Sequence, residues 1–208
     1  EINTAYRRQR QMCIRDRITM DFVTGLPMRN GKDSIWVIVD RLTKSAHFLA
    51  INKTDNAAVL AKLYVEQIVR LHGVPVSIVS DRDSKFYSAF WRAMQKSMGT
   101  KVHMSTAYHP QTDGQSERTI RTLEDLLRSC VLDWGDKWDQ YLHLAEFSSN
   151  NSYHASIGMS PYEALYGRPC RTPLCWTQVG ERSIFGRDFV EETTERIRVL
   201  KLKMKESQ

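Results

Sequence analysis

The chain has 208 residues, 41% of them apolar, which is enough for one domain with a packed core plus extensions. No segment approaches the roughly 18 apolar residues of a membrane span, and no continuous apolar stretch at the start suggests a secretory signal. The net charge is +6, but half of it comes from the five arginines and two acids of residues 1–17. Bulk charge therefore suits a polyanionic partner without establishing one.

The four cysteines show no spacing typical of a zinc site, and at this chain length they do not indicate a disulfide framework. The cysteine pattern favours reduced thiols in an intracellular protein.

The first half of the chain predicts strands. Residues 1–17 show no periodicity, and we expect a disordered or artefactual basic arm, with a genuine nucleic-acid-binding tail as the alternative. The alternating segment 18–23 predicts a first strand, and the apolar run 34–40 predicts a central strand covered on both faces. Residues 46–51 follow as a third strand. Strands this close in sequence favour an antiparallel meander, with a hairpin-type loop at 26–33.

The periodicity then becomes helical. Apolar residues at helical spacing over 59–71, ended by Gly73, predict a crossover helix that leads into a strand at 76–80. Such a crossover usually makes the next strand parallel to one of the first three. A helix at 88–98 and a short strand at 101–104 come next.

The rest of the chain is predicted to be helical, at 114–132, 138–149, from Ser160 onward and at 188–206. This order predicts an α/β protein with a ribonuclease H-like fold: a mixed five-stranded sheet, three antiparallel strands and then two more, flanked by helices. Five aromatic residues are assigned to its core: Trp36, Phe90, Trp91, Trp138 and Phe147.

Three acids lie at positions where such a fold can bring them together. Asp21 lies in the first strand, Asp81 directly follows the fourth, and Glu117 lies on the side of the long helix that carries its apolar stripe. Carboxylates from separate elements can hold divalent metal ions against a phosphodiester. With 24 acids in 208 residues, about three acid pairs occur by chance at any one separation, so the surrounding residues must decide.

Three other acids near these positions are assigned to structural roles. Asp83 is expected in a turn, Asp113 as a cap of the long helix, and Asp40 in an ion pair with Arg41 or Lys44. Direct contact with a metal ion is the alternative for each of the three.

The segments around the acids resemble the integrase catalytic core of gypsy-type LTR retrotransposons. The matching motifs are TMDFVTGLP at 19–27, SDRDSKF at 80–86, YHPQTDGQSER at 108–118 and ALYGR at 164–168. The 35 residues between Asp81 and Glu117 are the spacing of that family. By this resemblance residues 18–175 are the catalytic core, and residues 176–208 are a polar linker and a helix leading to a missing C-terminal domain.

The resemblance implies a polynucleotidyl transferase that trims and joins retroelement DNA 3′ ends into target DNA. Asp21, Asp81 and Glu117 would be both the catalytic residues and the ligands of two Mg²⁺ or Mn²⁺ ions. The partners would be element-end and target DNA, handled by at least a dimer, with no membrane involved. The protein would act in the nucleus, after residing in a cytoplasmic particle.

The residues between the last strand and the long helix suit contacts with DNA, because they combine stacking faces, amide donors and a guanidinium group. The predicted DNA-binding residues of this segment are Tyr108, His109, Gln111, Gln115 and Arg118. Lys44 and Lys85, which lie outside it, are predicted as further contacts with phosphate groups. Two other functions stay open: a catalytically inactive or truncated DNA-binding relic, and a ribonuclease H-like nuclease that cuts RNA–DNA hybrids.

Overall fold

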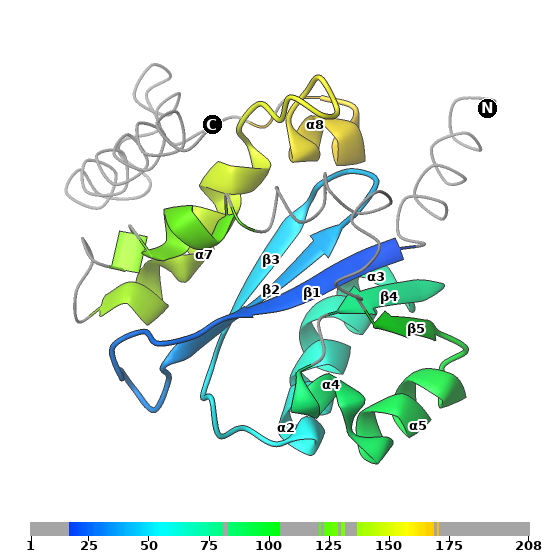
Figure 1. Ribbon diagram of the computed structural model, residues 1–208. Helices are drawn as coiled ribbons and strands as arrows, with labels where there is room; N and C mark the ends of the chain where they lie inside the picture. The colour runs from blue at the N-terminus through cyan, green and yellow to red at the C-terminus, as the bar shows by residue number, and fades with distance from the viewer. Residues whose placement is uncertain are drawn as a thin grey trace.

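The computed structural model describes residues 17–80, 83–104, 121, 123–128, 130–131, 137–168 and 170. Its centre is a five-stranded sheet with the strand order β3-β2-β1-β4-β5 (Figure 1). β1 pairs antiparallel with β2, and β2 pairs antiparallel with β3, whereas β4 is parallel to both β1 and β5. The predicted mixed sheet is therefore confirmed. The strands are β1 (Arg17–Val23), β2 (Ser34–Asp40), β3 (Ala46–Ile51), β4 (Ser77–Ser80) and β5 (Lys101–Met104).

Helices connect and cover the strands, and none within the described ranges is long and apolar enough to cross a membrane. Residues 121, 123–128 and 130–131 are also helical, within the long helix predicted over 114–132. The remaining helices are α2 (Ala57–Tyr64), the π-helical turn η1 (Val65–Val69), α3 (Arg70–His72), α4 (Ser84–Tyr87), α5 (Ala89–Ser97), α7 (Trp138–Asn150) and α8 (Pro161–Tyr166).

The sheet separates two hydrophobic clusters, because successive side chains of a strand point to opposite faces. In Figure 1, α7 lies on one side of the sheet and α2, α4 and α5 lie on the other. The cluster on the α7 side contains Val23, Val37 and Leu127, and the opposite cluster contains Met20, Trp36 and Trp91. β2 supplies apolar side chains to both clusters and is buried along its whole length, as its continuous apolar run predicts.

The crossover helix differs from the prediction of a regular amphipathic helix. A π-helical turn interrupts it at Val65–Val69, and an inserted π turn shifts the spacing of all later side chains. Leu71, predicted on the apolar face, follows the turn and is 50% exposed. Val59, predicted on the same face, lies before the turn and is 46% exposed. The helix ends at Gly73, whose φ of 78° suits a residue without a Cβ.

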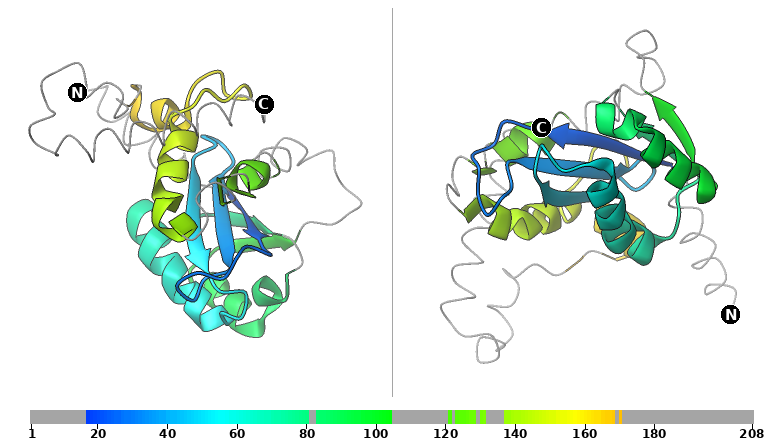
Figure 2. Two further views of the ribbon diagram at one scale, coloured as in Figure 1. Left: turned by 90° about the vertical axis from the view of Figure 1, so that its left-hand side faces the viewer. Right: turned by 90° about the horizontal axis from the view of Figure 1, so that it is seen from below.

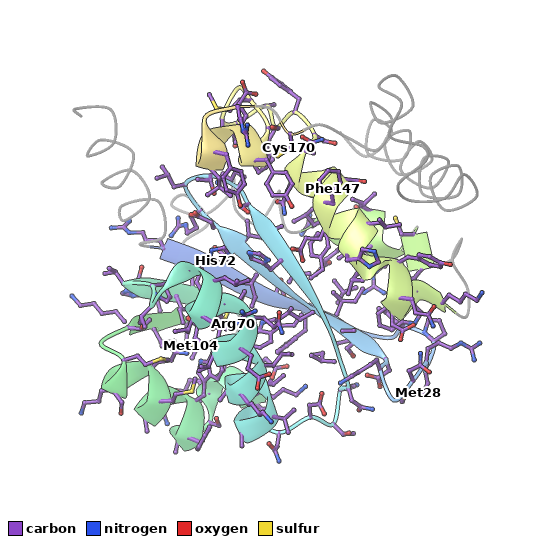
Figure 3. All side chains as sticks on the ribbon, turned by 180° about the vertical axis from the view of Figure 1, so that it is seen from behind. Met28, Arg70, His72, Met104, Phe147 and Cys170 are labelled. Atoms are coloured by element: carbon purple, nitrogen blue, oxygen red, sulfur yellow. The ribbon has the colours of Figure 1, made fainter. Side chains whose placement is uncertain are left out.

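The assignment of Phe90 to the core is wrong. Its side chain is 52% exposed, whereas the neighbouring Trp91 is 1% exposed and fills the core-facing position of α5. Adjacent helix residues point about 100° apart, so only one of the two can face the sheet. Trp36 and Trp138 are fully buried as predicted, and Phe147 is half-buried on α7 (Figure 3), where its ring lies 5.7 Å from that of Tyr162.

Side chains of α7 cover the outer edge of β3. The buried Asn150 accepts a hydrogen bond from the Ala46 N–H at 2.8 Å and donates one to the Ala46 carbonyl, also at 2.8 Å. Glu146 accepts a hydrogen bond from the Phe48 N–H at 2.8 Å. An uncovered edge strand can pair with another chain, so these contacts also protect the sheet.

We expect Asn150→Ala to lower the free energy of unfolding by about 1–3 kcal/mol, because it leaves buried backbone groups of Ala46 without partners. Urea denaturation followed by circular dichroism measures the loss. Asn151→Ala is the matched control, since among the described residues the Asn151 side-chain amide contacts only the Cys170 carbonyl, at 3.3 Å. Equal stability of the two variants would contradict the role given to Asn150.

Candidate functional site

Asp21 lies in the middle strand of the sheet, where β1 runs between β2 and β4. Its side chain is half-buried, and one carboxylate oxygen accepts a hydrogen bond from the Phe22 N–H at 2.8 Å. Asp21 is directly opposite Val37, and opposed residues share a face of the sheet. Val37 belongs to the cluster that Leu123 and Leu127 also join, so Asp21 lies on the face that the described part of the long helix covers.

The register of the parallel strands bears directly on the second predicted acid. Met20 of β1 is paired with Ser80, the last residue of β4. In the sequence, Asp21 follows Met20 and Asp81 follows Ser80. Asp21 and Asp81 are thus the residues that directly follow the two members of the Met20–Ser80 pair. Asp81 itself lies outside the described residues.

An aromatic and basic group lies behind Asp21 on the opposite face of the sheet. The ring of Phe22 stacks on that of Phe86, with centroids 4.7 Å apart and planes 8° apart. The Lys85 ammonium lies over the Phe22 ring, 4.9 Å from its centroid. The structure thus brings the predicted residue Lys85 close to the strand that carries Asp21, beside the stacked rings of Phe22 and Phe86, which the motifs did not predict as part of the site.

Two of the three other acids have structural contacts. Asp83 is the N-cap of α4 and accepts a hydrogen bond from the Lys85 N–H at 2.8 Å. Asp40 is 8% exposed, and its carboxylate accepts hydrogen bonds from the Leu42 N–H at 2.9 Å and the Thr43 hydroxyl at 3.0 Å. Such contacts are typical of aspartates that stabilise turns. Asp113 lies outside the described residues.

Lys44 lies in the turn between β2 and β3, at the far end of β1 from Asp21. The turn contacts the start of β1, where the Arg41 N–H donates to the Arg17 carbonyl at 3.0 Å. Asp21 lies four positions after Arg17, roughly 13 Å along the strand. Lys44 is 8% exposed and has a left-handed backbone with φ of 61°. Its contact with DNA stays a prediction.

Lys44 is close enough to His154 to act on its titration. Burial lowers the pKa of His154 below 6.5, and the positive charge of Lys44 lowers it further. A neutral folded-state histidine gives its full stabilisation above pH 6.5, and this is lost as the pH falls through the folded-state pKa.

We therefore expect Lys44→Gln to raise the pKa of His154 only part of the way to 6.5, because burial remains. The loss of stability in acid should then be smaller and should end at a higher pH. An NMR titration of the His154 ring measures the pKa, and Lys62→Gln on α2 is a matched control. An unchanged pKa in Lys44→Gln would contradict the contact.

The remaining predicted site residues fall outside the described part of the chain. They are Asp81, Tyr108, His109, Gln111, Gln115, Glu117 and Arg118. Within the ranges that the structure describes, no three His, Cys, Asp or Glu side chains form a group that could hold a metal ion. Asp21 is the one member of the predicted metal-binding set whose surroundings are defined, and its carboxylate is a ligand type that Mg²⁺ and Mn²⁺ prefer.

Solved structures share this fold. The catalytic core domain of BIV integrase aligns with a TM-score of 0.56 and 24% identity over 73% of this chain and 94% of that one. The HTLV-2 integrase catalytic core domain, solved with magnesium in a trimeric form, gives 0.56 and 19%, covering 73% and 97%. A chain of a simian T-cell lymphotropic virus intasome bound to PP2A regulatory subunit B56 gamma gives 0.58 and 16%, covering 76% and 56%. The chain therefore has a ribonuclease H-like fold.

Comparison of the sequence adds a likeness to one family. Residues 14–110 match the family model described as the integrase core domain. Over 160 residues, or 76% of the chain, it is 32% identical to the Tf2-3 and Tf2-4 transposon polyproteins of Schizosaccharomyces pombe, of whose length it spans about 12%. The match and this likeness confirm the predicted resemblance to an integrase core.

Proposed function

We propose that this chain is the catalytic core of a retroelement integrase, a polynucleotidyl transferase that trims and joins element DNA 3′ ends into target DNA. The match of residues 14–110 to the integrase core domain and the likeness to the Tf2 transposon polyproteins support this function. The observation that carries it is the pairing of Met20 with Ser80, because each residue is followed directly by one of the predicted acids.

We propose that Asp21, Asp81 and Glu117 hold two Mg²⁺ or Mn²⁺ ions. Three carboxylates form an all-oxygen donor set, completed by water and phosphate oxygens, which fits these hard cations. When bound, such a pair of ions stabilises the charge that develops on the attacking and leaving oxygens of an in-line displacement. The nucleophile is water during trimming and the new 3′-hydroxyl during strand transfer, so no covalent protein intermediate is required.

The chain itself contributes the placement of these groups. The Phe22 N–H orients one oxygen of Asp21, and Phe22 is held by its stack on Phe86. A carboxylate fixed in this way loses less entropy when it takes up its ligand. We further propose that Lys44, Lys85 and the 108–118 segment contact DNA through Tyr108, His109, Gln111, Gln115 and Arg118.

We propose that the whole protein acts as at least a dimer, because two element ends must be joined to target DNA together. Two solved structures that share this fold are an intasome and a trimeric form, which is consistent with assembly. We propose that the protein acts in the nucleus, after residing in a cytoplasmic particle.

The test is an assay of the purified chain on three labelled substrates: an element-end duplex, a branched DNA that mimics the joined product, and an RNA–DNA hybrid. We expect joining or its reversal in the presence of Mg²⁺ or Mn²⁺, complete loss with a chelator, and recovery when excess metal is restored. Calorimetric titration should show two bound ions.

The alternatives give different results. Hybrid cleavage without any DNA joining would identify a ribonuclease H-like nuclease. DNA binding without metal binding or cleavage would identify a catalytically inactive relic. Either outcome would overturn the proposed function.

A further inference from the structure

A hollow of about 360 Å³ lies where α5 ends and β5 begins. Arg92, Lys96, Gly99, Thr100, Lys101 and Val102 line it, and we refer to it as the α5–β5 hollow. Its three basic residues are all exposed. Within the described part of the chain, none of these three makes an ion pair. The hollow is open to solvent.

The surrounding segment has positive charges and no acids. Ser84–Met104 contains four Lys and Arg residues and no Asp or Glu, against a net charge of +6 for the whole chain. Arg92 and Lys96 are four residues apart on α5, where like charges repel each other and destabilise a helix. This segment has no acids that would offset the repulsion between its positive charges. A surface with such uncompensated positive charge attracts anions.

The floor of the hollow is held by backbone contacts. Gly99 takes the left-handed conformation, with φ of 78°, and its N–H donates to the Lys96 carbonyl at 3.0 Å. The Thr100 hydroxyl donates to the Pro75 carbonyl at 2.7 Å, and the Lys101 N–H donates to the Val76 carbonyl at 2.9 Å. The chain around the basic residues is therefore fixed before a ligand arrives, which lowers the entropy lost on binding.

The hollow lies on the same layer as the group behind Asp21. Lys85 on α4 lies over Phe22, and Arg92 on α5 lies over the ring of Tyr87, 4.9 Å from its centroid. The right-hand view of Figure 2 shows α5 alongside β5 at the edge of the sheet. Basic groups thus extend along α4 and α5 from the strand of Asp21 to the edge strand.

We propose that the α5–β5 hollow binds the sugar–phosphate backbone of duplex DNA, as an anchoring site separate from the three acids. Arg92, Lys96 and Lys101 would contact phosphate groups, and no residue of the hollow would read base sequence. The choice of DNA over another polyanion rests on the proposed function.

The experiment measures binding of the full chain to a labelled 30-base-pair duplex by fluorescence anisotropy over a series of salt concentrations, with a chelator present. The variant carries Arg92→Gln, Lys96→Gln and Lys101→Gln. A control with the same change of charge carries Lys53→Gln, Lys62→Gln and Lys137→Gln, which are exposed residues outside the hollow. Circular dichroism checks that both variants unfold at the temperature of the parent chain.

We expect the hollow variant to bind at least tenfold more weakly at low salt. Its slope of log K against log salt should be shallower by up to about 2.7, or roughly 0.9 for each lost phosphate contact. The control should keep the parent slope. Equal losses in the two variants, no loss in either, or no duplex binding by the parent chain would each overturn the proposal.

This test does not depend on catalysis. Because a chelator is present, binding at the hollow can be confirmed even if the chain joins no DNA. If the chain joins DNA in the presence of Mg²⁺ and the hollow variant binds duplex normally, the proposed function stands and the anchoring site is rejected.

Discussion

Asp21→Asn should abolish DNA joining while leaving the fold intact. Asparagine keeps a side-chain oxygen that can accept the hydrogen bond from the Phe22 N–H, so the local backbone contact is retained. It removes the negative charge that the proposed metal ions require. Charge stabilisation by metal ions is worth several kcal/mol in the transition state, so we expect a rate loss on the order of 10³-fold or more.

The assay is joining of labelled element-end DNA, together with calorimetric titration of Mg²⁺ and Mn²⁺. Asp125→Asn is the matched control, because Asp125 is an exposed acid on the described part of the long helix. The control should retain parent activity and metal binding. Full activity of Asp21→Asn would contradict the assignment of this acid, whatever happens to the other two.

Trp36→Ala should produce the largest loss of stability. Trp36 is fully buried in β2, and its ring lies 5.8 Å from each of the rings of Phe22, Phe86 and Trp91. Removing a buried tryptophan leaves a cavity that the surrounding side chains fill only in part. We expect the free energy of unfolding to fall by about 3–5 kcal/mol. Urea denaturation followed by tryptophan fluorescence and circular dichroism measures the loss.

Phe90→Ala is the control for this prediction, because the same kind of ring is 52% exposed on α5. Exposed substitutions of this sort usually change stability by less than about 0.5 kcal/mol. Trp36→Phe should be milder than Trp36→Ala, because it keeps a ring in the cluster. A loss in Phe90→Ala as large as that in Trp36→Ala would contradict the two-cluster description of the core.

The strands were predictable because each has a simple burial pattern. β2 lies between two covered faces, so its apolar run is unbroken, and its bounds match the prediction. β3 and β5 also match their predicted ranges. The parallel pairing of β4 followed from the intervening crossover helix.

Other features depend on packing that periodicity does not report. The spacing of apolar residues in the crossover helix fits a regular helix, whereas the structure inserts the π turn at Val65–Val69. Phe90 and Trp91 are both aromatic, and only their positions relative to the sheet decide which is buried. α4 is a single turn set by the Asp83 cap, and four residues are too few for a periodic signal.

The motifs predicted neighbouring strands for Asp21 and Asp81, and Met20 and Ser80, the residues before them, are paired. The roles of the acids stay predictions. The α5–β5 hollow was not predicted, because Lys96 and Lys101 come from different elements and meet only through the turn at Gly99. A signal for it was present in the sequence as the acid-free run of Ser84–Met104.

The cover that α7 places over β3 has a consequence for synthesis of the chain. Asn150 and Ala46 are 104 residues apart, so the edge of β3 leaves the ribosome long before its partner is made. At about 5–20 residues per second, translation of the intervening segment takes roughly 5–20 s. During that interval the nascent sheet has an unprotected edge. A chaperone bound to β3, or slow pairing of β3 with other chains, would limit aggregation during this time. Variants that weaken α7 should therefore show their defect first as a low yield of soluble protein.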